Sequence, residues 1–243
     1  YNEEEGLIIC TKKINELFSN ELKEYDYEHI ICDNNSNEKT KESRLGYIPL
    51  SWNLYKLKEI LNKGRLGGNY QNSESERGVP LIKMGNLSRG KINLERIQYI
   101  PEGLEYDSED ILKDGDLLFN TRNTLELVGK VAIWKNELPK ALYNSNIMRF
   151  EFNNDIISSN DFMNLVFNSR RGINQLRSFA TGTTSVAAIY SPELMRFKCV
   201  IPSKKEQEQI VNIADGITKS ITSITSKLES SKALQKSLIN QVF

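Results

Sequence analysis

The stretch from Pro202 to Phe243 constrains the fold of this chain most strongly. It contains no proline after Pro202, and its one glycine, Gly216, costs about 1 kcal/mol relative to alanine in a helix. Its apolar residues recur mostly at three- and four-residue steps, which is the spacing of one helix face. These residues are Ile210, Ile213, Ile217, Ile221, Ile224, Leu228, Leu234 and Leu238. We name them the apolar stripe and predict that they belong to one long helix.

A helix of this length cannot bury the apolar stripe by itself. At about 1.5 Å per residue, roughly 40 residues form a rod about 60 Å long, which is longer than a compact domain of this size needs. A row of Ile and Leu side chains on such a rod has to be covered by another helix. The pattern therefore predicts a globular domain with a coiled-coil-type helix. The apolar stripe is the predicted interface to a second copy or to another member of an assembly.

Composition places the chain among ordinary soluble proteins. Its 243 residues are enough for one domain with a sizeable core and an extension. It has no secretory signal, and no apolar stretch approaches the roughly 20 residues of a membrane span. Its three cysteines, Cys10, Cys32 and Cys199, are far apart and odd in number, so no disulfide framework is expected. We predict a cytoplasmic protein that does not associate with a membrane.

The formal net charge is zero, and its distribution is more informative than its sum. Residues 47–201 contain 20 basic and 17 acidic side chains, whereas residues 1–46 contain 6 and 11. The middle of the chain is therefore mildly basic, which permits DNA binding but does not by itself indicate it.

The chain divides into three segments of different pattern. Residues 7–25 have an amphipathic helical pattern, which either lies along the final helix or packs on the surface of the globular part. Residues 33–43 are polar, without aromatic or aliphatic side chains, and predict an exposed linker. We expect residues 1–46 to form this helix and linker, residues 47–201 a globular domain, and residues 202–243 the long helix.

The globular part combines short strands with one helical stretch, which predicts the α+β class with a mixed, curled sheet. The predicted strands are Val79–Met84, Asp116–Asn120, Gly129–Trp134, Ile147–Phe152 and Phe197–Pro202. Residues 160–180 have helical spacing, and Ser159, Asn160 and Asp161 are all capable N-caps.

The connections are less regular. Leu54–Leu61 is a short element that is either strand or helix, and Asp114-Gly115 predicts a turn. Gly64–Gly78 and Ala180–Val186 predict loops. Trp52 and Trp134 lie in apolar contexts and are expected in the core.

Known catalytic patterns do not occur in the sequence. A methyltransferase acting alone needs a glycine-rich cofactor loop and an Asn/Asp-Pro-Pro-aromatic motif, and no Pro-Pro pair is found. Glu21-Leu22-Lys23 has the Glu-x-Lys form of some nucleases, but no Pro-Asp precedes it, and surface helices are rich in such charges. His29 and Cys32 make a lone His-x-x-Cys, which does not complete a zinc site. Lys63–Gly68 lacks the Gly-Lys-Ser/Thr of an NTPase loop. We predict no catalytic residue, metal or cofactor.

Four polar loops contain the donors that DNA binding requires, which are bidentate groups for bases and cationic or hydroxyl groups for phosphates. The predicted DNA-binding residues are Arg65, Asn69, Gln71, Asn72 and Arg77 in the first loop, Lys83, Asn86 and Arg89 in the second, Arg122, Asn123 and Thr124 in the third, and Thr183 and Thr184 in the fourth. For each residue the alternative is a solvated side chain without a ligand. Thr183 and Thr184 have a second alternative, a structural role where the chain returns to the long helix.

Several motifs together resemble the DNA-specificity (S) subunit of Type I restriction-modification systems. They occur in the family's order and spacing across residues 46–215. The motifs are Gly46-Tyr47-Ile48-Pro49-Leu50-Ser51-Trp52, Gly115-Asp116-Leu117-Leu118, Gly182-Thr183-Thr184, and the stretch from Ile201-Pro202 through Glu206-Gln207 to Ile210-Val211.

The resemblance implies a target-recognition domain at residues 47–201 that binds one half of a bipartite site on double-stranded DNA. It implies that the long helix is a spacer and a docking surface for methyltransferase subunits, with a restriction subunit in the same system. The chain itself would not be an enzyme. Full-length S subunits have two recognition domains and two long helices, and this chain resembles one of each. The resemblance therefore implies a homodimer through the long helix, whose two-fold symmetry matches a symmetric DNA site.

Two alternatives remain open at this point. The chain begins at Tyr1 and not at methionine, so it is alternatively the DNA-recognition region of a larger single-chain restriction-modification enzyme or DNA methyltransferase. The other alternative is a structural coiled-coil adaptor without a nucleic-acid role.

Overall fold

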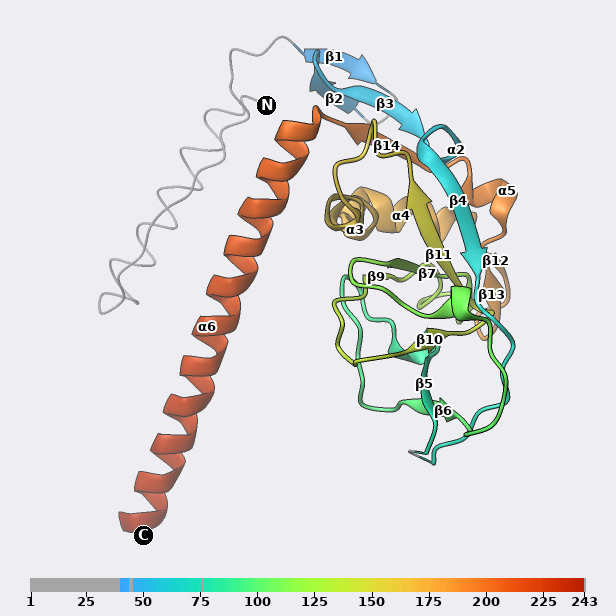
Figure 1. Ribbon diagram of the computed structural model, residues 1–243. Coiled ribbons are helices and arrows are strands. Elements are labelled where there is room, and N and C mark those ends of the chain that lie inside the picture. Colours follow the sequence, from blue (N-terminus) through green and yellow to red (C-terminus); the bar gives the residue numbers. More distant parts are fainter. Residues whose placement is uncertain (1–39, 44–45, 76, 243) are drawn as a thin grey trace, which may run out of the picture. The chain divides into compact units, whose positions relative to one another are not determined.

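The computed structural model describes residues 40–43, 46–75 and 77–242 (Figure 1). The predicted amphipathic helix at 7–25, the Glu-x-Lys and His-x-x-Cys patterns, and most of the predicted linker lie outside the described residues. The last linker residues do not form a loop, contrary to expectation. They form strand β1 (Thr40–Ser43), antiparallel to β2 (Gly46–Pro49). Lys41 supports this hairpin, because its Nζ donates to the carbonyl oxygen of Leu50 at 2.9 Å.

The central sheet has the strand order β4 (Leu61–Leu66), β11 (Ile147–Phe152), β7 (Leu117–Asn120) and β9 (Val131–Ile133), with antiparallel neighbours throughout. The predicted strands at 116–120, 129–134 and 147–152 are thus confirmed, with ends shifted by a few residues.

One part of a predicted loop proved to be strand. Gly64–Leu66, placed by the sequence at the start of a polar loop, belongs to β4 and pairs with Met148–Phe150. A Cβ at residue 64 would lie 2.8 Å from the Met148 sulfur, so this flexible side chain would have to shift. The glycine that suggested a loop is therefore a strand residue that leaves room for the Met148 side chain.

Alternate residues of the sheet enter two different cores. Leu117, Phe119 and Phe150 belong to the core that includes the helices, whereas Leu118 and Ile147 belong to a second core on the opposite face with Trp134. The helix-side core contains a row of aromatic rings, with Phe150 lying 5.5 Å from Phe119 and 5.6 Å from Phe167 between ring centroids. Strands β7, β9 and β11 are therefore covered on both faces, whereas the edge strand β4 is largely exposed.

A smaller sheet lies on the second core and gives the fold its mixed character. Its order is β10 (Leu142–Tyr143), β5 (Val79–Ile82) and β6 (Gln98–Ile100), and β10 is parallel to β5 whereas β6 is antiparallel. The 3-10 turn η1 (Met84–Asn86) lies between β5 and β6 within this layer, and η2 (Ser108–Asp110) lies in the connection from β6 to β7 of the central sheet. The α+β class with a mixed sheet is therefore confirmed.

The predicted helical stretch consists of two helices, α3 (Asn160–Asn168) and α4 (Arg170–Phe179). Ser159 caps α3 by accepting from the Phe162 N–H at 3.3 Å, as one of the proposed caps. Ser169 ends α3 and caps α4, because its Oγ accepts from the Gly172 N–H at 3.0 Å. The tight joint requires glycine, since a Cβ on Gly172 would lie 2.4 Å from the Val166 oxygen.

The remaining strands form two small sheets. β8 (Arg122–Asn123), β13 (Ala187–Ala188) and β12 (Thr181–Gly182) make one, so the predicted loop 180–186 is largely the turn of a hairpin. β14 (Lys198–Ile201) pairs with β3 (Asn53–Lys56) in the other. The short helix α2 (Leu57–Ile60) follows β3, and α5 (Ser191–Leu194) precedes β14.

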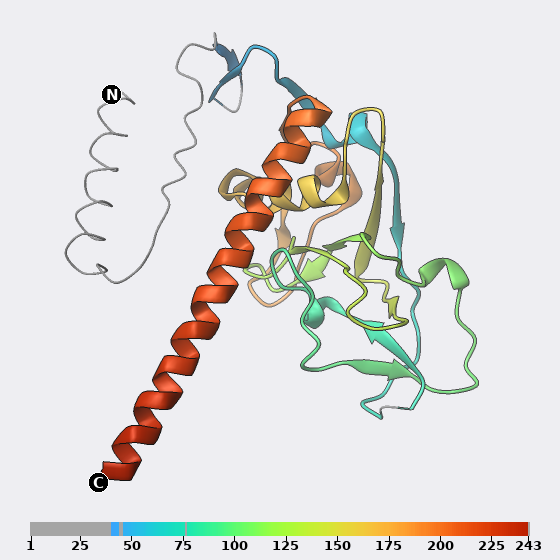
Figure 2. The same cartoon turned by 60° about the vertical axis from the view of Figure 1, so that its left-hand side comes forward.

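The long helix is confirmed as α6 (Lys204–Val242), which both views show as one unbroken helix (Figures 1 and 2). Its first turn is fixed by a helix joint, which we define as Trp52, Glu206 and Gln207. Gln207 is fully buried, and its Nε2 donates to the carbonyl oxygens of Ile156 and Pro202 at 2.8 and 3.0 Å. Trp52 is half-buried rather than fully in the core, and its Nε1 donates to Glu206 Oε1 at 3.2 Å.

The apolar stripe is covered only at its beginning. Ile210 is half-buried against the helix-side core, so it contacts the globular part of its own chain. The other seven stripe residues are exposed, from 44% for Ile213 to 65% for Ile224. Among the described residues, no helix combines the length and apolar character needed to cross a bilayer.

Candidate nucleic-acid interface

Two of the four predicted DNA-binding loops lie side by side. Ala187 and Ala188 pair with Asn123 and Arg122 in antiparallel register. The Leu125 N–H also donates to the Thr184 carbonyl oxygen at 3.1 Å. Residues 122–125 and 181–188 therefore form a continuous surface, which we call the hairpin surface. This proximity could not be predicted from the sequence, because about 60 residues separate the paired strands and the register is set by tertiary structure.

Arg122 supplies the one cationic side chain of the hairpin surface. Its side chain is exposed and makes no hydrogen bond or ion pair with any described residue. The buried Asn120 fixes the backbone beneath it, since Asn120 Oδ1 accepts from the Arg122 N–H at 3.1 Å. A guanidinium held this way can donate two parallel hydrogen bonds to a guanine edge or a phosphate.

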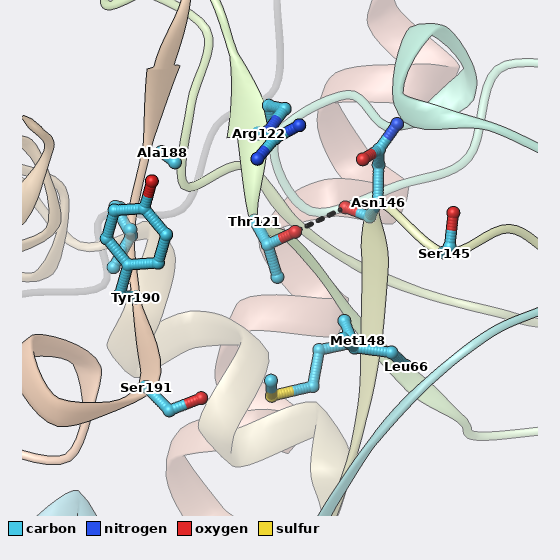
Figure 3. Close-up of a pocket in the computed structure, with 10 residues that line it drawn as sticks. Leu66, Thr121, Arg122, Ser145, Asn146, Met148, Ala188, Tyr190 and Ser191 are labelled. Atoms are coloured by element: carbon cyan, nitrogen blue, oxygen red, sulfur yellow. Dashed lines mark hydrogen bonds between the residues drawn. The ribbon is translucent and has the colours of Figure 1, made fainter. Parts of the chain in front are cut away.

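A shallow hollow of about 300 Å³ lies beside Arg122 (Figure 3). Thr121 and Asn146 form its polar wall, where Thr121 Oγ1 donates to the Asn146 carbonyl oxygen at 2.9 Å. Tyr190 lies across from them and is 55% exposed. The complete lining is Leu66, Thr121, Arg122, Ser145, Asn146, Met148, Ala188, Ile189, Tyr190 and Ser191. An exposed aromatic ring beside amide, hydroxyl and guanidinium groups suits contact with nucleotides better than with an apolar ligand.

The polar residues of the hairpin surface differ in whether their side chains already have hydrogen-bond partners. Thr183 Oγ1 accepts from the Val186 N–H at 3.2 Å, which agrees with the structural alternative for this residue. Thr184 is exposed, and its carbonyl oxygen is the group bonded to Leu125. Asn123 Oδ1 accepts from the Thr124 N–H at 2.8 Å, and both residues are half-buried.

In the first predicted loop, some side chains have protein partners and others are exposed. Arg65 forms ion pairs with Asp107 at 2.7 Å and Asp110 at 3.1 Å, and hydrogen bonds to these carboxylates raise its pKa. Tyr70 Oη donates to Asp110 at 2.6 Å, and burial followed by this bond raises the pKa of Tyr70 to about 12. These contacts hold the loop in place. Asn69, Gln71 and Arg77 are exposed at its surface.

Polar partners also engage Asn72 and the start of the second loop. Lys83 Nζ donates to Asn72 Oδ1 at 3.1 Å and to Gln98 Oε1 at 2.7 Å. Asn86 is only 3% exposed, and its Nδ2 donates to the carbonyl oxygens of Asn93 and Arg96 at 3.0 and 3.2 Å. The amide of Asn86 therefore faces the protein interior, where it organises the turn after β5.

We expect Asn86→Ala to lower the free energy of unfolding by about 2–3 kcal/mol, because two carbonyl oxygens and the Lys83 N–H would lose their partner inside the protein. Urea unfolding measures this loss. Ser88→Ala, two residues further along the same loop, is the matched control and should cost much less. A stable Asn86→Ala variant with reduced DNA affinity would instead indicate a direct contact with DNA.

Arg89 is the remaining predicted residue, and it is half-buried. Its Nη1 atom is buried and has no hydrogen-bond partner among the described residues. Sequence reasoning missed two cations that lie near it, Lys130 and Arg177, since residues this far apart show no common pattern in the chain. Within the described residues, no group of three or more His, Cys, Asp or Glu side chains is arranged to hold a metal ion.

Comparison with known proteins agrees with these features. Residues 49–231 match the model of the Type I restriction modification DNA specificity domain. The chain is 27% identical over 205 residues to the type I restriction enzyme MjaVIII specificity subunit of Methanocaldococcus jannaschii, which covers 82% of this chain and 47% of that protein. The chain thus spans about half the length of the curated relatives it matches.

Solved structures show the same fold at low sequence identity. A chain from a study of complex assembly and conformational transition of the type I R-M system matches 97% of this chain and 52% of its own length, with TM-score 0.54 and 15% identity. The HsdS subunit of Thermoanaerobacter tengcongensis matches 73% of this chain and 44% of its own length, with TM-score 0.52 and 15% identity. Because the family model matches most of the chain, the protein belongs to the family of Type I restriction modification DNA specificity domains.

Proposed function

We propose that this protein is the sequence-specific DNA-binding specificity subunit of a Type I restriction-modification system, or one half of such a subunit. Residues 47–201 form the recognition domain and bind one half of a bipartite site on double-stranded DNA. Residues 202–243 form the spacer helix. Catalysis belongs to partner methyltransferase and restriction subunits, and the chain supplies recognition only.

The hairpin surface is the observation on which the recognition role rests. Arg122 is exposed and unpaired among the described residues. It lies opposite Ala188 and lines the hollow with Tyr190, and its backbone is fixed by Asn120. Because the backbone is already fixed, binding orders only the Arg122 side chain, which limits the entropy cost of a bidentate base contact. Asn69, Gln71 and Arg77 remain further candidates on a second exposed loop.

The exposed apolar stripe supports the assembly role. Seven Ile and Leu side chains on one face of α6 are left exposed by the other described residues. A second copy of the helix would bury them and place two recognition domains about a two-fold axis, as a symmetric interrupted DNA site requires. The same helices would then offer a docking surface for methyltransferase subunits.

We expect Arg122→Ala to weaken binding to the specific DNA site about 10- to 100-fold, the effect of losing one bidentate base contact. The site is first identified by mapping methylated positions in a host that contains this chain and its partner subunits. Affinity is then measured at fixed salt with those partners present.

Lys58→Ala is the charge-matched control for this experiment, because Lys58 is exposed on α2, outside the hairpin surface. Its affinity should equal that of the wild type, and both variants should keep the wild-type melting temperature. Equal affinity of Arg122→Ala and wild type would remove the hairpin surface from the proposal.

A further inference from the structure

Arg89, Lys130 and Arg177 form a cluster of positive charge that is distinct from the hairpin surface. We call it the cation cluster. Arg89 follows η1, Lys130 immediately precedes β9, and Arg177 lies in the last turn of α4. The three segments are held together by their neighbours: the Gly90 N–H donates to the Val131 carbonyl oxygen at 2.8 Å, and Asn164 Nδ2 of α3 donates to the Gly90 carbonyl oxygen at 3.1 Å.

On the α4 side of the cation cluster, the backbone at Gly129 packs closely against α4. Gly129, next to Lys130, has a positive φ of 74° and is buried. A Cβ placed there would lie 3.2 Å from Leu176 Cβ, and Leu176 is followed directly by Arg177. The backbone before β9 can therefore approach α4 closely, which brings two of the cations to the same region.

No carboxylate compensates the cation cluster among the described residues. The ion pairs between described residues involve Arg65, Lys135 and Arg149, and none involves a residue of the cation cluster. No side-chain hydrogen bond from Arg89, Lys130 or Arg177 to a described residue is present, and Arg89 Nη1 is buried without a partner.

The position of the cation cluster lowers the pKa values of two of its members. Burial, and then the charge of Arg177, lowers the pKa of Arg89. Burial, and then the charge of Arg89, lowers the pKa of Lys130. Arg89 and Lys130 are partly withdrawn from water and Arg177 is exposed, and unpaired like charges in this position are unfavourable in the free protein. Such an arrangement is relieved when an anion binds.

From this geometry we propose that Arg89, Lys130 and Arg177 bind a phosphodiester group of the DNA backbone. The inference rests on the proposed function and adds to it a phosphate contact separate from base readout. Guanidinium groups donate in a planar fork that matches two phosphate oxygens, and an ammonium group adds a third, less directional donor.

The position of the cation cluster along the chain favours duplex DNA as the source of the phosphate. Lys130 is directly paired with Asn120, since the Asn120 N–H donates to the Lys130 carbonyl oxygen at 2.9 Å. Asn120 is also the residue whose side chain fixes the Arg122 backbone. One buried residue thus links the two proposed contacts, through its backbone N–H at Lys130 and its side-chain oxygen at Arg122. Phosphate contacts fix the register and orientation in which base-contacting groups meet the groove.

The test measures DNA affinity of the full chain on an unrelated duplex across a series of salt concentrations. For Lys130→Gln and Arg177→Gln we expect the slope of log affinity against log salt to fall in magnitude by about 1 each, with similar losses on specific and unrelated sequences. Both variants should melt at or above the wild-type temperature, because like-charge repulsion is reduced.

Arg171→Gln is the matched control, since Arg171 is an exposed cation of the same helix that lines a different groove with Trp52 and Phe197. Wild-type slopes for both cluster variants, or an equal change in Arg171→Gln, would overturn the inference. Inorganic phosphate should raise the melting temperature of the wild type more than that of Lys130→Gln. If phosphate raises the melting temperature of the wild type but the salt slopes of the cluster variants are unchanged, the cation cluster is a site for free anions, and the inference is also overturned. Failure of the wild type to bind any duplex at low salt would instead reject the proposed function itself.

Discussion

Ile217→Asp and Ile224→Asp are expected to break the proposed assembly of this chain into dimers. Both side chains are exposed in α6, at 49% and 65%, and lie on the same helix face. In the proposed pairing they would be buried, and a carboxylate in such an apolar interface costs several kcal/mol, which lowers association by at least about 100-fold. Light scattering or sedimentation of the purified chain measures the change in mass.

Ser226→Asp is the matched control, because Ser226 lies on the opposite face of the same helix, between the two test positions and the C-terminal part of the stripe. It introduces the same charge at an exposed position and should leave the mass unchanged. If the Ile217→Asp and Ile224→Asp variants remain dimeric, the apolar stripe is not the interface between copies. If the wild type is monomeric alone and dimeric only with methyltransferase subunits, the stripe contacts those subunits instead.

Phe150→Ala is expected to lower the free energy of unfolding by about 3–5 kcal/mol. Phe150 lies at the centre of β11, is 1% exposed, and contacts the rings of Phe119, Phe152 and Phe167 at centroid distances of 5.5–5.8 Å. Removing it would leave a cavity where the central sheet meets α3. Urea unfolding followed by circular dichroism measures the loss.

Two further variants make this measurement specific to packing. Phe150→Leu keeps most of the volume and should lie between wild type and Phe150→Ala. Leu165→Ala removes an apolar side chain on α3 that is 36% exposed, and it should cost much less. Equal losses for Phe150→Ala and Leu165→Ala would mean that the aromatic row does not hold the sheet and the helices together.

The elements with a strong local pattern were predictable from the sequence. The long helix followed from its apolar period, and the strands 117–120, 131–133 and 147–152 from their short apolar runs between turns. Errors arose where tertiary contacts override a local signal. Gly64 suggests a loop but belongs to β4, where it leaves room for the Met148 side chain, and Ser169 breaks one helical period into two helices by capping the second.

The candidate site was less predictable, for a related reason. The sequence identifies polar side chains but not which of them already have partners. Arg65 and Asn86 have the chemistry of DNA contacts, yet ion pairs with two aspartates and hydrogen bonds to two carbonyl oxygens engage them. Conversely, Lys130 and Arg177 are unremarkable in the sequence and become candidates only through their position beside Arg89. Which of these residues contact DNA stays a prediction until the variants are measured.

The helix joint makes α6 a lever. Trp52, Glu206 and Gln207 fix its base. From Gln207 to Val242 the helix extends roughly 50 Å at about 1.5 Å per residue. A tilt of about 10° at the base therefore moves the far end by roughly 9 Å. In a paired assembly this displacement corresponds to between two and three steps of about 3.4 Å along a DNA duplex. Small changes around Gln207 would therefore shift the preferred gap between half-sites while leaving the bases read within each half-site the same.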